Sequence, residues 1–393
     1  MPGQLRVVVV AVTRIRSLLV VFVLSYSQAA ISLVLPQDRA DALFHSYDGG
    51  GITITGPSVL VRKSVGDSVS ISANHYVDSI SSASVDVIAI LGPSRYTEER
   101  TQNSLGIDYL NDKSLMSLSY TSSVENDFDA TTTSFGITQE MFGGLTTVSM
   151  SFRYGDNIIG KTGESSFEKY SDTTGYRVGL SQVLTKNTIM GLTYEIITDE
   201  GFLNNPYRKV RYLDLTVPKT FSFEDEVYPN TRTSNAVSFN ARYFLPYRAA
   251  IYASYRYFID SWDIEAGTYE IGYVHPYEEN WLFDISYRYY SQTKAEFYSD
   301  LYNSSEEKTI RARDKELSTF SDHVIGIGAT YEFGKQGFWL FEKGSANFYY
   351  NLFMFKYDDF RDIPGAVPGT VAGEEPLYDF TANVFRLYLS LWF

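Results

Sequence analysis

The sequence predicts an all-β protein: a transmembrane antiparallel β-barrel of about 16 strands, with short periplasmic turns and long extracellular loops. Along most of the 393-residue chain, apolar and polar residues alternate in segments longer than the five or six residues of an ordinary globular strand. Aromatic residues make up 16% of the chain, with 32 Tyr and 26 Phe, which suits two interfacial girdles. The chain also ends on an alternating apolar strand that stops at Phe393.

The composition excludes several classes of function. The chain has no Cys, so disulfides, thiolate nucleophiles and Cys-ligated metals are excluded together. Its formal charge of -14 at pH 7 argues against nucleic acid as a partner, because binding a phosphate backbone requires clustered Lys and Arg.

Residues 1–30 have the pattern of a secretory signal peptide. Arg6, Arg14 and Arg16 precede the apolar run 17–24, and a small-residue site follows at 27–30. The alternative is a membrane anchor, but the uncharged stretch is too short to span a bilayer as a helix.

Residues 31–56 are predicted to form a non-repetitive lead-in that lies in the periplasm or in the barrel mouth. Residues 38–46 could form one or two helical turns, and Gly49, Gly50 and Gly51 would then end any regular structure.

The barrel is predicted to occupy residues 57–393. In a typical strand, Val237, Phe239 and Ala241 share one face and Ser238 and Asn240 share the other. Sixteen strands are expected, although 14 or 18 remain possible because the first three are the least distinct; they lie near 57–64, 67–77, 84–91, 98–110, 114–124, 129–141, 145–155, 169–184, 188–199, 233–245, 249–260, 262–275, 281–293, 318–333, 339–357 and 378–393.

The connections alternate in length, as expected of an outer-membrane barrel. Tight turns are expected at 111–113, 142–144, 185–187, 246–248, 276–280 and 334–337, and longer loops near 92–97, 125–128, 156–168, 200–232, 294–317 and 358–376. This scheme places one short turn, Val65-Gly-Asp67, on the extracellular side.

The final strand should close the barrel against the first, with its apolar face toward lipid. An aromatic terminus after alternating apolar residues resembles the assembly signal of bacterial outer-membrane barrels, which implies the barrel assembly machinery as a partner. The residues of this signal are Phe385, Leu387, Leu389, Leu391 and Phe393.

Several stretches resemble a known bacterial family, domain-of-unknown-function family 3570, across essentially the whole mature chain. They are LPQDRAD (35–41), YDGGG (47–51), TDEGFLNNPYR (198–208), VYPNTRTSN (227–235), YFLPYR (243–248), YRYYSQT (287–293), ARDKELS (312–318) and GEEPLY (373–378). The resemblance implies an outer-membrane barrel of a diderm bacterium. The family has no settled activity, so the resemblance supplies no catalytic positions.

Four histidines limit any hydrolytic site: His45, His75, His275 and His323. None lies in a nucleophile elbow or an HExxH pattern, so turn or interface positions are the favoured interpretation. An outer-membrane hydrolase built from His75 or His323 with an Asp or Ser is the weaker alternative.

Acidic clusters in the loops raise the question of a divalent cation site, because Ca²⁺ prefers oxygen ligands. No EF-hand spacing is present, so solvated loop charge is favoured and no metal or cofactor is expected; the clusters are 125–129, 224–226, 358–359 and 374–375.

The charges on the polar strand faces are predicted to point into the lumen. An Arg facing lipid at the bilayer midplane would cost about 2 to 4 kcal/mol. These charges either close a salt-bridged interior or form an eyelet that screens solutes. The predicted lumen residues are Asp108, Arg153, Arg177, Glu195, Arg242, Arg256, Glu270, Asp284, Arg288, Glu332 and Arg386, with Arg242, Arg256, Arg288, Glu270 and Asp284 as the constriction.

The sequence therefore favours a passive channel or transporter in the bacterial outer membrane for small polar or charged solutes. Loop 200–232 could fold inward and set the width of the pore. The first alternative is a closed barrel that docks a periplasmic partner through the lead-in, and an outer-membrane hydrolase ranks third. Outer-membrane lipid and lipopolysaccharide are the expected surroundings, and neither solute nor oligomeric state follows from the sequence.

Overall fold

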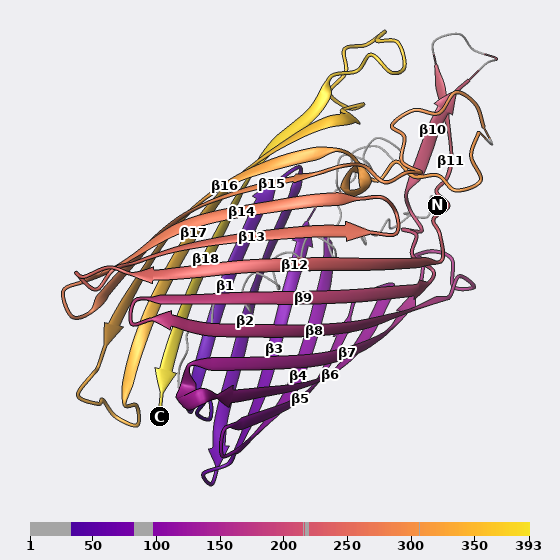
Figure 1. Ribbon diagram of the computed structural model, residues 1–393. Helices are drawn as coiled ribbons and strands as arrows, with labels where there is room; N and C mark the ends of the chain where they lie inside the picture. Colours follow the sequence, from indigo (N-terminus) through magenta and orange to yellow (C-terminus); the bar gives the residue numbers. More distant parts are fainter. Residues whose placement is uncertain (1–32, 82–96, 215, 217–219, 306) are drawn as a thin grey trace.

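The computed structural model describes residues 33–81, 97–214, 216, 220–305 and 307–393. Sixteen antiparallel strands form one closed barrel, and a separate hairpin, β10 (Lys209–Leu213) and β11 (Phe221–Asp225), stands beyond its rim (Figure 1). The barrel strands are β1 (Arg39–Gly49), β2 (Ile52–Val65), β3 (Val69–Ser81), β4 (Thr97–Asn111), β5 (Ser114–Val124), β6 (Phe128–Met141), β7 (Thr146–Ile159), β8 (Lys169–Thr185), β9 (Thr188–Gly201), β12 (Thr231–Phe244), β13 (Ala250–Asp260), β14 (Glu265–Tyr277), β15 (Trp281–Gln292), β16 (Phe320–Phe333), β17 (Lys343–Arg361) and β18 (Leu377–Trp392).

The predicted fold class and strand number are confirmed. Every strand predicted from residue 98 onward overlaps an observed strand, and each pairs antiparallel with its neighbours in the ring. Within the described ranges, no helix is long and apolar enough to cross a membrane.

The prediction for the start of the barrel is wrong. The expected lead-in at 31–56 contains β1 and the first residues of β2, and residues 38–46 are extended rather than helical. Gly50 and Gly51, both with positive φ, do not end the regular structure but form the tight turn between β1 and β2. The predicted strand 84–91 falls outside the described residues, and β3 pairs directly with β4. The predicted signal peptide also lies outside them.

The extra strand at the front changes which end of the barrel carries each early turn. Arg39 and Trp392 are Cα partners, so both ends of the barrel chain lie at the same rim. The turn 66–68 lies at that rim and not, as predicted, on the side of the long loops. The six predicted tight turns share this rim, whereas the connections 160–168, 202–230, 293–319 and 362–376 lie at the opposite one. We call these the periplasmic and extracellular rims.

The seam between β1 and β18 closes the barrel. The two strands pair from Arg39↔Trp392 to Gly49↔Ala382 (Figure 1). The apolar residues of the predicted assembly signal alternate outward, and Leu387 is 55% exposed. At the chain end, the Phe393 amide donates to the Asp38 carbonyl and the Lys63 ammonium lies 4.9 Å from the Phe393 ring.

The outer wall is apolar at positions two apart, as a lipid-facing surface requires. Leu105 is 62% exposed and Ile271 55%, and similar residues recur on the other barrel strands. In water such a surface would aggregate, but in a bilayer it is solvated by acyl chains and every barrel strand has a partner on each side.

The inner wall near the extracellular rim carries an aromatic cluster that the sequence did not predict. Phe320, Tyr357, Phe360 and Tyr378 are buried there, with Phe355 and Phe380 packed against them. The Phe355 and Phe380 rings stack with centroids 4.6 Å apart. This part of the barrel interior is therefore packed.

Candidate functional site

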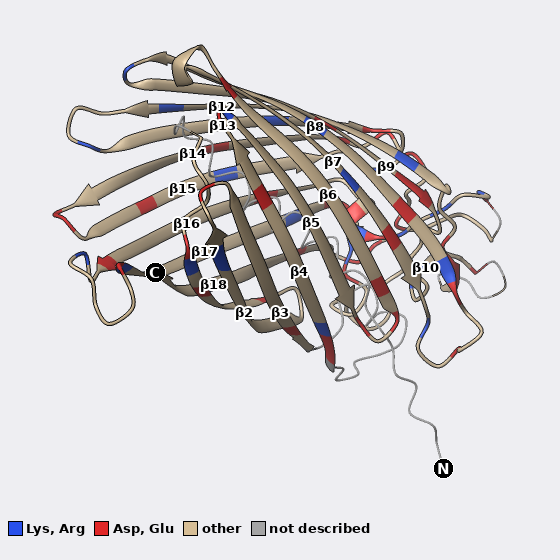
Figure 2. Ribbon diagram, turned by 90° about the horizontal axis from the view of Figure 1, so that it is seen from below, with Lys and Arg blue, Asp and Glu red and all other residues tan. Residues whose placement is uncertain are grey.

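The predicted lumen residues point inward in the structure. Each lies between outward-facing apolar neighbours on its strand: Arg177 between Tyr176 and Val178, which are 55% and 44% exposed, and Arg386 between Phe385 and Leu387. Charged residues accordingly recur along the barrel strands in Figure 2. The period of two, which is set by the pleat, allows this assignment from the sequence.

The centre of one wall carries a group of three charges, here called the Glu195 triad. Glu195 on β9 accepts a hydrogen bond from Arg177 on β8 at 3.1 Å. A second guanidinium, that of Arg256 on β13, lies 3.7 Å from the other carboxylate oxygen. The Arg177 and Arg256 side chains are 37% and 31% exposed, so two cations share one carboxylate beside accessible space.

Charged side chains also face inward from the next strands of the ring. Arg288 on β15 pairs with Asp322 on β16 at 2.9 Å and lies over the Phe353 ring. Glu270 on β14 is the Cα partner of Arg288 across the ladder.

The predicted constriction divides into two levels. Arg242 and Asp284 lie near the periplasmic ends of β12 and β15, whereas Arg256, Glu270 and Arg288 lie near the middle of their strands. The Tyr252 hydroxyl hydrogen-bonds Asp284, and its ring crosses Gly272, where any Cβ would overlap it. The single cluster predicted from strand order is therefore not formed, because residues close in strand order lie at different heights.

The remaining predicted residues are more scattered. Arg153 lies against Gly175, Arg386 donates to Asn351 at 2.9 Å, and Asp108 pairs with Arg62 at 3.2 Å. Glu332 lies at the periplasmic end of β16 and pairs with Lys335.

A His–Asp pair on the opposite wall was missed. His45 Nε2 lies 2.8 Å from the Asp78 carboxylate and 3.2 Å from the Tyr76 hydroxyl, and the His45 and Tyr76 rings stack. Arg100 lies 3.7 Å from the other Asp78 oxygen. The assignment of His45 to an irregular lead-in hid this contact, because only a strand at 39–49 brings it into the barrel.

The other three histidines lie on the outer wall. His75 bonds Asn103, His275 bonds Tyr273 and His323 bonds Tyr287. Although Asp322 is adjacent to His323 in sequence, its side chain points inward to Arg288. The two histidines proposed for a hydrolase are thus outer-wall residues bonded to an amide and a phenol group.

Part of the loop 202–230 crosses the extracellular rim and is anchored there at two points. At Tyr207, the hydroxyl donates to Asp127 in the β5–β6 connection and accepts from the Thr162 amide in the β7–β8 connection at 2.7 Å. At Arg211, the guanidinium donates to Glu375 in the β17–β18 connection at 2.6 and 3.1 Å. Four strands separate the β5–β6 and β17–β18 connections on one side of the ring and eight on the other. Residues 207–211, here called the strap, therefore join distant parts of the rim.

Burial and charge determine the ionisation of the groups that hold the strap. Burial raises the pKa of Asp127 to about 6, although the Tyr207 hydrogen bond opposes this. Burial also raises the pKa of Tyr207. For Glu375, burial acts to raise the pKa, but the hydrogen bonds from Arg211 outweigh it and hold the pKa below its usual value.

A network of buried ion pairs surrounds Arg211, whose side chain has no exposed surface. Besides Glu375, it binds Asp300, which also binds Arg313 at 2.9 Å. Nearby, Arg208 pairs with Asp314. These contacts join the loops 202–230, 293–319 and 362–376 into one unit, which we call the cap.

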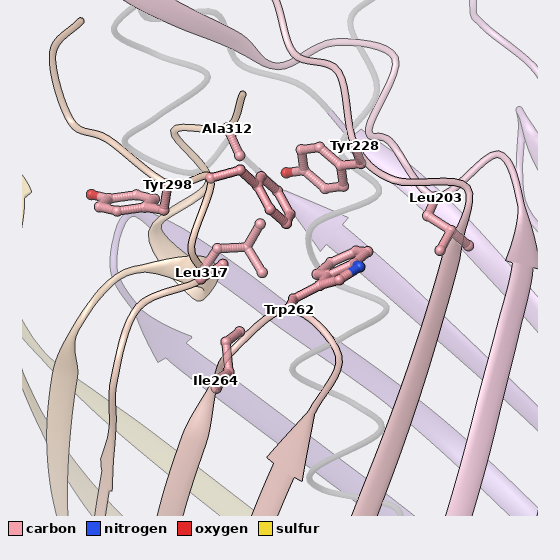
Figure 3. Close-up of a cluster of buried hydrophobic side chains, with 9 residues drawn as sticks. Leu203, Tyr228, Trp262, Ile264, Tyr298, Ala312 and Leu317 are labelled. Atoms are coloured by element: carbon pink, nitrogen blue, oxygen red, sulfur yellow. The ribbon is translucent and has the colours of Figure 1, made fainter. Parts of the chain in front are cut away.

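The cap has its own apolar core (Figure 3). Trp262 at the β13–β14 turn packs edge-on against Tyr228 and Phe297, and Leu317 and Tyr298 belong to the same cluster. Trp262 is 2% exposed and Leu317 1%. The long loops are therefore held in place by packing as well as by charge.

The acidic loop clusters considered for a cation have other roles. Glu375 binds Arg211, Glu224 binds Arg311 at 3.2 Å, and Asp127 binds Tyr207. In the part of the chain that the structure describes, no group of three or more His, Asp or Glu side chains has an arrangement that could hold a metal ion.

Known structures with similar architecture are outer-membrane proteins at low identity. A bacterial polysaccharide outer membrane secretin is 9% identical, with a TM-score of 0.45 and coverage of 91% of this chain and 99% of that one. A Pseudomonas aeruginosa FadL homologue is 10% identical, with a TM-score of 0.41 and coverage of 91% and 90%. OmpT of Vibrio cholerae is 9% identical, with a TM-score of 0.42 and coverage of 92% and 100%. These values reflect a shared fold class only.

No curated protein sequence matches the chain. A family model, described as protein of unknown function (DUF3570), matches residues 85–349, which extend from the β3–β4 connection into β17 and include the Glu195 triad and most of the cap. The chain belongs to this family.

Proposed function

We propose that this protein is a channel or transporter of the bacterial outer membrane that passes small polar or charged solutes through a mixed-charge lumen. The Glu195 triad carries the proposal. Two partly exposed guanidinium groups share one carboxylate at mid-barrel, which leaves positive charge facing the lumen. A barrel interior that served only to close the fold would pair each cation with its own anion, because an uncompensated buried charge costs several kcal/mol.

The cap regulates access in this proposal. The strap lies over the extracellular rim and is fixed at both ends, so a solute must pass beside it or displace it. Loop 200–232 was expected to set the width of the pore, and its place over the rim supports that role.

Single-channel conductance in planar bilayers tests the proposal. The expected result is a low conductance for the intact barrel and a higher one when residues 204–229 are replaced by a short Gly-Ser linker. If neither protein conducts above background, the channel proposal fails.

A closed barrel that docks a partner is the second candidate, and the extensive buried network of the cap favours it. It would then present the cap or residues 33–38 as a fixed surface. Of these, Leu33 donates its amide to Glu140 at 2.8 Å near the periplasmic rim. Absence of conductance from both proteins would select this candidate.

A further inference from the structure

The outer wall of β16, β17 and β18 carries a groove of about 530 Å³ near the extracellular rim. Six of its eight lining residues form two rows of Cα partners across the three strands, and the other two, Phe355 and Phe380, are partners in the inward-facing row between them. The upper row is Ser321, Lys356 and Asp379, and the lower row is His323, Met354 and Thr381. All six belong to the outward-facing set, as does Ile325 two positions after His323.

We propose that this groove binds the phosphorylated sugar headgroup of an outer-leaflet glycolipid of the lipid A type. The proposal depends on the membrane location given above but not on conduction. Lys356 supplies an exposed ammonium for a phosphate, and Ser321 and Thr381 supply hydroxyl donors. The His323 Nδ1 hydrogen-bonds the Tyr287 hydroxyl at 2.7 Å, so the other ring nitrogen, Nε2, points away from Tyr287.

The surface below the groove fits the rest of such a lipid. The next rows toward the membrane centre are Ile325, Leu352 and Asn383, and then Ile327, Tyr350 and Phe385. The Tyr350 hydroxyl donates to the Asn383 side chain at 2.8 Å, so the polar group of that row has a partner. An acyl chain would therefore run down a wall that is apolar apart from Asn383, while its headgroup stays at the rim. The His323 ring, 5.0 Å from that of Tyr289, belongs to the aromatic girdle that marks this interface.

The charge of the groove contrasts with another sector of the same rim. On β7, β8 and β9, Asp156, Asp172 and Glu200 are successive Cα partners on the exposed outer face. That sector repels phosphate. In the groove, Asp379 is the single acid and lies beside the Lys356 ammonium, so a phosphate is accommodated there.

Native mass spectrometry of the detergent-purified full chain, titrated with diphosphoryl lipid A in EDTA, tests the proposal. Lys356→Gln should bind the first lipid about tenfold more weakly, in line with the loss of one charge-assisted hydrogen bond, and Lys356→Arg should retain binding. Lys335→Gln, in the β16–β17 turn at the periplasmic rim, is the matched control and should bind like the wild type.

Three outcomes would overturn the proposal: unchanged affinity in Lys356→Gln, an equal loss in Lys335→Gln, or equally tight wild-type binding of phosphatidylglycerol. Each variant should still run as a folded barrel on an unheated gel. Conductance should be the same in all of them, so a failure here differs from a failure of the channel proposal.

Discussion

Arg211 and Glu375 lie 164 positions apart and form a two-point hydrogen-bonded ion pair that has almost no contact with solvent. The pair joins the β10–β11 hairpin to the connection before β18. It therefore couples the strap to the strand that closes the barrel. Because both partners are buried, losing either one would destabilise the closed cap, whereas losing an exposed surface ion pair would not.

Replacing Arg211 by Ala should open the cap without unfolding the barrel. The change leaves Glu375 buried without its cation, at a cost of about 3 to 5 kcal/mol. The expected result is faster tryptic cleavage within 202–230 and 293–319, while the barrel keeps its gel mobility. Lys209→Ala is the control, since Lys209 and its partner Asp225 are 40% and 82% exposed. Equal protease resistance of Arg211→Ala and wild type would show that the pair does not hold the cap.

The other end of the strap should respond to pH. The pKa of Asp127 is about 6 in the folded cap, against 3.8 for an ordinary Asp, so the folded cap retains a proton that the open loop releases. The contribution of Asp127 to the stability of the closed cap is therefore complete below pH 3.8 and is lost as the pH rises through 6. Glu375 has the opposite pH dependence, because its pKa is lowered in the folded cap. Its stabilisation of the closed cap is present above pH 4.5 and is lost on acidification.

Hydrogen exchange of peptides covering 203–213 at pH 5 and pH 7.5, corrected for intrinsic exchange, measures this response. The strap should be better protected at pH 5. Asp127→Asn, which mimics the protonated acid, should abolish the difference, whereas Asp129→Asn, on an exposed strand position nearby, should keep it. A pH response that survives in Asp127→Asn would assign it to another group.

Ion selectivity should follow the Glu195 triad. Glu195→Gln removes the carboxylate that Arg177 and Arg256 share, so the reversal potential in a KCl gradient should shift toward anion preference. The double change Arg177→Gln and Arg256→Gln should shift it toward cations. Asp172→Asn, on the outer face of β8, is the control of equal charge and should leave selectivity unchanged. Identical reversal potentials in all four proteins would remove the triad from the ion path.

Strand faces could be predicted from the sequence because the pleat fixes a period of two. Arg177 and Arg386 were placed inward on this basis alone. The height of a residue within the barrel could not be predicted from the sequence, because it depends on strand register and tilt. For this reason Arg242 and Arg256 were wrongly assigned to one cluster. On β17, Phe353, Phe355 and Tyr357 turn inward while Met354 faces outward. With apolar residues on both faces, the pattern does not show which one meets lipid.

The cap contacts were also beyond prediction from the sequence. Arg211 and Asp300 lie in loops without periodicity, and their pairing requires the positions of connections that are far apart in the chain. The prediction of the first strands was wrong for a different reason. Gly49 and its two neighbours suggested a break, but a tight turn between β1 and β2 uses the same residues.

Gly49 provides the test of that correction. A Cβ at Gly49 would lie 2.2 Å from the Ala382 Cβ and 2.5 Å from the Ala382 Cα, across the seam between β1 and β18. Gly49→Ala must therefore push the two strands apart, at a cost of about 1 to 3 kcal/mol, and lower the temperature at which the barrel unfolds on a gel. Gly136→Ala on β6 is the matched control, because its nearest neighbour would lie at 3.8 Å. If residues 31–56 were a periplasmic lead-in, both changes would leave the unfolding temperature unaltered; a drop in Gly49→Ala alone identifies β1 as the strand that closes the barrel.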